Sequence, residues 1–100
     1  MAESDVRIVA QIKSYIEQHG GNYPAWYVGL AEHPEERLMS HGVNLDQDPC
    51  IFRTASCVDD AKSVRQYFTT HLGTHGDPDN SDNENALSVY AYRKSRATHP

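Results

Sequence analysis

The sequence predicts a small α/β domain of the α+β type, in which a sheet of about three strands packs with about three helices. Apolar residues recur at helical spacing in two segments, proline and glycine bound a third, short helix, and three short runs of aromatic and β-branched residues are typical of strands. The predicted order is helix, strand, helix, strand, helix, strand, which places helices on a small sheet. The 100 residues suit one domain, and no linker or internal repeat divides them. We expect residues 1–100 to form a single domain with a flexible tail at 95–100.

The first predicted elements are a helix and a buried strand. Ser4 is a suitable N-cap, and the pair Gly20 and Gly21 ends a run of apolar residues at helical spacing. These apolar residues include Val9, Ile12 and Ile16. Residues 25–31 then predict a buried strand, in which Gly29 is typical of a bulge or a close approach of backbone.

A short second helix follows this strand almost at once. Pro34 suits the first helical position, and Gly42 suits the position after the last. The polar side chains of this helix are therefore expected close to the end of the preceding strand.

The second half of the chain predicts a strand, a helix and a last strand. Residues 50–55 favour a strand, and an apolar stripe at helical spacing then runs until Gly73. The stripe consists of Ala61, Val64, Phe68 and Leu72. Residues 87–93 alternate in the period of a half-buried strand.

Residues 74–85 predict a mobile loop. They concentrate turn formers and acids and contain no aliphatic residue. The acids lack the central glycine and the spaced glutamate of a calcium loop, so a solvated loop is favoured. Its length also leaves open a role as a lid or a partner-binding segment.

The charge of the chain bears on its partners and location. Nine Lys and Arg against fourteen Asp and Glu give a net charge of -5, which opposes diffuse attraction to nucleic acid. The candidates for a local basic patch are Arg53, Arg65, Arg93, Lys94 and Arg96. No apolar run is long enough to span a bilayer, and the N-terminus lacks a secretory pattern, so we expect no membrane association and a cytoplasmic location.

The cysteines and histidines do not indicate a structural metal or a disulfide framework. Cys50 and Cys57 are expected as reduced thiols, and neither is a convincing nucleophile. No close-paired zinc spacing joins them to the histidines considered, which are His33, His41, His71 and His75.

The segment Trp-Tyr-Val-Gly-Leu-Ala-Glu-His-Pro-Glu-Glu-Arg-Leu-Met-Ser-His-Gly, residues 26–42, resembles the GIY-YIG nuclease family. That family carries Tyr-Ile-Gly or Tyr-Val-Gly in its second motif strand, followed by a helix with an Arg-Leu-x-x-His pattern. The residues that match in order and spacing are Tyr27, Val28, Gly29, Arg37, Leu38 and His41. The resemblance implies a GIY-YIG-like domain and a nuclease-related site.

Two departures from the family pattern stand out. The first motif strand, which ends in Gly-Ile-Tyr, is absent upstream, and residues 87–93 are expected to fill its place beside residues 25–31, as in a circular permutation. The family's metal-binding glutamate falls at Arg65 when Ala61 is aligned with the Ala-x-x-x-Glu pattern. A guanidinium only donates hydrogen bonds and cannot hold Mg²⁺. We therefore expect no metal site of the usual kind.

The resemblance gives roles to a few side chains, each with a structural alternative. Arg37 would hold a phosphate, or else pair with Glu32 or Glu36. His41 lies one turn beyond Arg37 on the same helix face and would act as a base or donor, or else cap the helix. Tyr27 and Tyr90 or Tyr92 would align water, or else pack.

Three functions remain open. The first is a non-catalytic binding module without a cofactor, which uses Tyr27, Arg37, His41 and Arg65 to bind a protein, nucleotide or nucleic-acid partner; the net charge favours a protein. The alternative is a metal-dependent endonuclease or phosphodiesterase with a displaced metal ligand, which would need Mg²⁺ or Mn²⁺. Its catalytic residues would be Tyr27, Arg37, His41 and Tyr90. The third is a structural role with a vestigial site.

Overall fold

The computed structural model describes residues 4–76, 86–95 and 98, and the statements below refer to these residues. Residues 77–85 of the predicted loop and most of the predicted tail lie outside them. The elements are α1 (Asp5–Gln18), a 3₁₀ turn (Tyr23–Ala25), β1 (Trp26–Ala31), α2 (Pro34–Ser40), β2 (Cys50–Thr54), α3 (Val58–Tyr67), a π-helical turn (Phe68–Leu72), β3 (His75–Gly76) and β4 (Ser88–Arg93). The predicted α+β class is confirmed.

The sheet formed by the described residues has four strands in the order β2, β4, β1, β3. The expectation of three strands is corrected by β3, whose His75 and Gly76 pair in parallel with Tyr27 and Val28. A strand of two residues has no hydrophobic alternation, so the sequence pattern could not reveal it. A Cβ atom added at Gly76 would lie only 2.7 Å from the carbonyl oxygen of Val28, so glycine permits the approach.

The last strand lies in the middle of the sheet, antiparallel to both of its neighbours. Tyr27 pairs with Tyr92 and Gly29 pairs with Tyr90 along β1, while β2 pairs with the other edge of β4. The expectation that residues 87–93 lie beside residues 25–31 is therefore confirmed.

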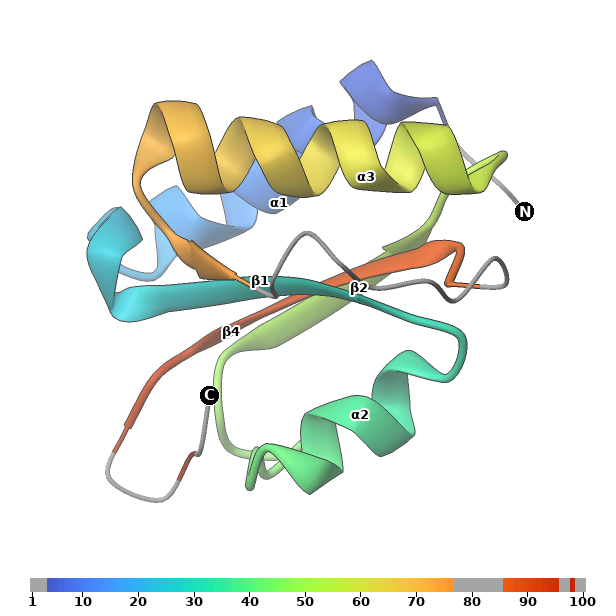
Figure 1. Cartoon of the computed structure of the whole chain (residues 1–100). Helices are drawn as coiled ribbons and strands as arrows, with labels where there is room; N and C mark the ends of the chain where they lie inside the picture. Colours follow the sequence, from blue (N-terminus) through green and yellow to red (C-terminus); the bar gives the residue numbers. More distant parts are fainter. Residues whose placement is uncertain (1–3, 77–85, 96–97, 99–100) are drawn as a thin grey trace.

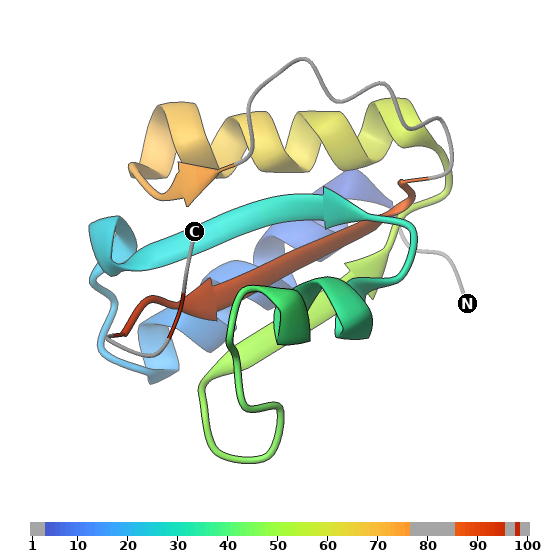
Figure 2. The same cartoon turned by 60° about the horizontal axis from the view of Figure 1, so that its bottom comes forward.

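The helices cover the two faces of the sheet unequally, with α1 and α3 on one face and α2 on the other (Figure 1, Figure 2). Strand alternation separates two cores, because successive side chains point to opposite faces. The larger core, beneath α1 and α3, includes Ile8, Ile12, Trp26, Val28, Val64, Phe68 and Val89. The smaller core, beneath α2, contains Tyr27, Ala31, Leu38, Val43, Tyr90 and Tyr92.

The first helix forms as the sequence predicts. The Ser4 hydroxyl accepts a hydrogen bond from the backbone N–H of Arg7, and Gly21 N–H donates to Ile16 O at the other end. Gly20 and Gly21 have positive φ angles of 108° and 69°, which glycine adopts without strain. Among the described residues, no helix is long and apolar enough to cross a membrane.

Leu38 fixes α2 to the sheet, and this makes a first prediction. Its side chain is 0% exposed, whereas the next residue, Met39, is 55% exposed. We expect Leu38→Ala to lower the free energy of unfolding by about 2–5 kcal/mol, because it leaves a cavity beneath α2. Met39→Ala, the matched control on the same helix, should change it by less than about 0.5 kcal/mol. Urea unfolding followed by circular dichroism measures both; equal effects would contradict the docking.

Candidate functional site

The face of the sheet beneath α2 carries a cluster of aromatic rings, which we call the tyrosine face: Tyr27, Tyr90 and Tyr92, with His41 above them. The ring of Tyr27 stacks on those of Tyr92 and Tyr90, with centroids 5.4 and 6.3 Å apart. The three tyrosines share a face because they occupy alternating positions on two paired strands. The sequence analysis named Tyr92 only as a substitute for Tyr90, although this alternation could have placed both rings together.

His41 joins α2 to this face. It follows the last residue of α2, and its backbone N–H donates to Arg37 O. Its Nε2 shares a hydrogen bond of 2.9 Å with the hydroxyl of Tyr90, and its ring centroid lies 5.0 Å from that of Tyr27. His41 thus both ends the helix and is held in a fixed orientation by the buried tyrosine.

Arg37 projects from the helix turn before His41. Its side chain is exposed, and within the described part of the chain its guanidinium makes no ion pair or hydrogen bond. The carboxylate of Glu32 instead lies 3.9 Å from His33 Nε2. Arg37 is therefore free to bind an external anion, as the functional interpretation of this residue requires.

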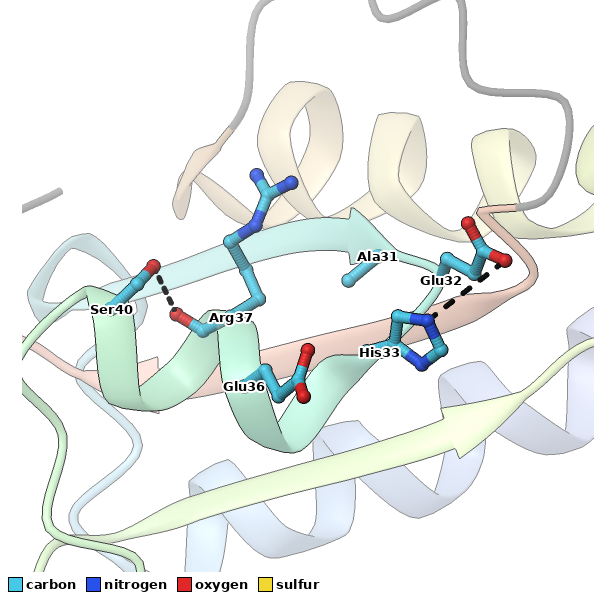
Figure 3. A pocket seen from close by; sticks show the side chains of 6 residues that line it. All are labelled: Ala31, Glu32, His33, Glu36, Arg37 and Ser40. Carbon is cyan, nitrogen blue, oxygen red and sulfur yellow. Dashed lines mark hydrogen bonds and ion pairs between the residues drawn. The ribbon is translucent and has the colours of Figure 1, made fainter.

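A pocket of about 310 Å³ lies beside Arg37, between α2 and the end of β1. It is lined by Ala31, Glu32, His33, Glu36, Arg37 and Ser40. Figure 3 shows the Arg37 guanidinium extending across β1, while the Glu36 carboxylate takes a different direction. The Ser40 hydroxyl donates to Arg37 O at 3.0 Å and so satisfies a carbonyl in the last turn of the helix. Sequence reasoning did not name Ser40 or the pocket, because only the fold brings α2 against β1.

A second cationic group lies at the start of β1. Lys94 N–H donates to Ala25 O, which extends the pairing of β4 by one residue. Its Nζ lies 2.8 Å from His75 Nδ1, and His75 pairs with Tyr27 in the sheet. Because paired residues direct their side chains to the same face, His75 and Lys94 lie on the tyrosine face.

The tyrosines of the predicted site are much less accessible than Arg37. Tyr90 is 0% exposed and Tyr27 is 7% exposed. Tyr90 therefore orients His41 from below and does not meet a ligand itself in this structure. Tyr27 offers a ligand only a narrow edge of its ring.

Arg65 does not join the other predicted site residues. It lies on α3, which packs on the opposite face of the sheet from α2, and it is 3% exposed. The sequence analysis grouped it with Tyr27, Arg37 and His41 because the motif alignment carries no information about sheet faces. The candidates for a basic patch do not gather at this site either. Arg53 bonds to Gln11 of α1, and Arg96 lies outside the described residues.

The described residues hold no group of three or more His, Cys, Asp or Glu side chains that could bind a metal ion. Glu32 and Glu36 are the acids that line the pocket beside Arg37. His33 also lines this pocket, and these three side chains do not form such a group.

Comparison with protein-family models, with curated proteins and with solved structures found no match for this chain. Functional inference therefore depends on the geometry above.

The hydrogen bond between His41 and Tyr90 can be measured by a double-mutant cycle. We expect Tyr90→Phe and His41→Ala to be coupled by about 0.5–1.5 kcal/mol in the free energy of unfolding, because either change removes the same bond. Urea unfolding of the wild type, both single variants and the double variant gives the coupling. Tyr15→Phe with His41→Ala is the control pair, and a coupling no larger than that of this pair would contradict the contact.

The two cysteines are both free and differ in environment, with Cys50 half-buried and Cys57 exposed. Burial raises the pKa of the Cys50 thiol, and the nearby charge of Asp48 raises it further. Because the thiolate is the reactive form, we expect iodoacetamide to alkylate Cys57 before Cys50 at neutral pH. Peptide mapping by mass spectrometry measures this order. The difference should vanish in denaturant, and faster reaction of Cys50 in the folded protein would contradict it.

Proposed function

We propose that this chain is a non-catalytic, GIY-YIG-like binding module that holds a phosphate group of a nucleotide or a nucleic-acid end beside Arg37 and His41. The observation that carries the proposal is the exposed Arg37 guanidinium, which has no ion pair among the described residues and lies one turn from a fixed imidazole. A guanidinium matches two phosphate oxygens at once, and this pairing is strongest when no internal carboxylate competes.

The sheet face beneath Arg37 carries further polar and cationic groups, beside the acids Glu32 and Glu36 that line the pocket. Lys94 lies on the same sheet face, where its ammonium donates to His75 Nδ1, so the positive charge of this face is not limited to one helix. The hydrogen bond to Tyr90 holds the His41 ring in a fixed orientation at the end of the same helix. The position of β4 beside β1 also fits the proposed permuted relation to the GIY-YIG family.

The alternative is a metal-dependent endonuclease or phosphodiesterase of GIY-YIG type with Mg²⁺ or Mn²⁺. It would need metal ligands beside Arg37, where the described residues Glu32, His33 and Glu36 line the pocket without forming a group that could hold a metal ion. The inaccessible Tyr90 also favours positioning of His41 over direct activation of water. These observations support binding over cleavage.

Arg37→Ala tests the binding function. With a short single-stranded oligonucleotide carrying a 5′-phosphate, we expect it to weaken binding roughly 10- to 100-fold, because it removes a charge-assisted hydrogen bond. Fluorescence anisotropy measures the affinity. Arg7→Ala is the matched control, since it removes an exposed cation from α1 on the other sheet face. Equal weakening by both variants would show diffuse attraction and overturn the site; binding of a protein but of no phosphorylated probe would overturn the phosphate assignment.

Titration with Mg²⁺ or Mn²⁺ separates binding from metal-dependent cleavage. We expect millimolar metal to leave the backbone amide signals of Tyr27, Glu32 and Arg37 in place. Localised shifts at these residues, together with cleavage of the oligonucleotide, would establish the enzyme instead.

A further inference from the structure

Strand β2 forms the outer edge of the sheet on the side away from β3 (Figure 2). Ala55 N–H donates to Leu87 O, and Arg93 N–H donates to Pro49 O, so odd-numbered residues of this segment bond towards β4. In an antiparallel pair, alternate residues point their backbone groups to opposite sides. Cys50, Phe52 and Thr54 therefore direct their N–H and C=O groups out of the sheet.

A groove lies on each side of this edge. The groove on the α1 side, about 380 Å³, is lined by the polar side chains of Gln11, Ser14 and Gln18 together with Arg53. The groove on the α2 side, about 550 Å³, is lined by Leu45, Cys50 and Phe52, with Glu35 at its border. The two grooves share Tyr15, Ile51 and Arg53.

We propose that β2 accepts an added strand from an extended peptide segment of a partner protein, in which acidic residues alternate with apolar ones. Successive side chains of an added strand point to opposite faces, so they would enter the two grooves alternately. The apolar residues fit the groove of Leu45 and Phe52, where Glu35 would repel an acid. The acidic residues fit the other groove, because none of its lining residues is acidic and its charged lining residue is Arg53, which both grooves share.

Two side chains cover part of the free edge and give the proposal its selectivity. The hydroxyl of Tyr15 accepts a hydrogen bond of 3.1 Å from Cys50 N–H, and Arg53 Nη1 donates one of 2.7 Å to Phe52 O. Side chains that bond to the free backbone groups of an edge strand hinder unspecific pairing with other strands. An acidic side chain on the peptide draws the Arg53 guanidinium away from Phe52 O and frees that carbonyl for the added strand. A basic peptide would leave the cover in place.

The test uses a blocked peptide, acetyl-Val-Glu-Val-Glu-Val-amide, and the same peptide with lysine in place of glutamate. With the ¹⁵N-labelled protein, we expect the acidic peptide to shift the amide signals of Cys50, Phe52 and Thr54 and to slow hydrogen exchange at Phe52 and Thr54. The lysine peptide should leave these signals in place. Arg37→Ala should not change this result, since the edge lies apart from the phosphate site.

Charge reversal at Arg53 is the decisive variant. Arg53→Glu should weaken binding of the acidic peptide about tenfold and should allow the lysine peptide to bind. Arg7→Glu, which makes the same charge change on an α1 residue outside both grooves, should do neither. Shifts that map elsewhere, or an unchanged preference in Arg53→Glu, would overturn the proposal. So would concentration-dependent self-association of Arg53→Ala without peptide binding, because the covers would then only prevent pairing with a second copy of the chain.

Discussion

The central position of β4 is the constraint on which the rest of the structure depends. This strand is the last regular element that the structure describes, yet it pairs along both edges with strands from the first and second thirds of the sequence. Its residues from Ser88 to Tyr92 are all buried, which is how a strand is covered when helices lie on both faces of a sheet. Among the described strands only β4 connects β1 to β2, because β3 pairs with β1 alone, so this sheet assembles only when β4 is in place. The long-range pairings make folding depend on contacts that are distant in sequence.

The two faces of β4 show how one strand serves two purposes. Val89 and Ala91 point into the aliphatic core beneath α1 and α3, where close packing provides most of the burial. Tyr90 and Tyr92 point the other way, into a core of rings with polar tips. A tyrosine hydroxyl in such a place needs a hydrogen-bond partner, and His41 provides one for Tyr90. The contact that satisfies a buried hydroxyl therefore also fixes the imidazole beside Arg37, and stability and site geometry are coupled at this point.

The sequence predicted the elements whose periodicity is strong and missed those that depend on tertiary contact. The stripes of Val9, Ile12 and Ile16 and of Ala61, Val64 and Phe68 placed α1 and α3, and alternation placed β4. In the structure Ile8, and not Val9, is the fully buried residue at the start of the first stripe. β3 has two residues and no pattern. Arg65 lies on the sheet face that α3 covers, opposite to α2. A motif alignment does not show which face of a sheet a helix covers. The burial of Tyr90 could not be predicted either. It depends on the position of α2 over the sheet, and the residues of β4 do not indicate that position.

The arginines illustrate how context decides the role of one residue type. Arg53 is engaged by Gln11 and by a backbone carbonyl, so a ligand must compete for it, and the competition confers selectivity. Among the described residues, no side chain bonds to the Arg37 guanidinium. An anion that binds there would not have to break an internal hydrogen bond or ion pair first. An exposed guanidinium one helical turn from an oriented imidazole is the arrangement from which we propose phosphate binding.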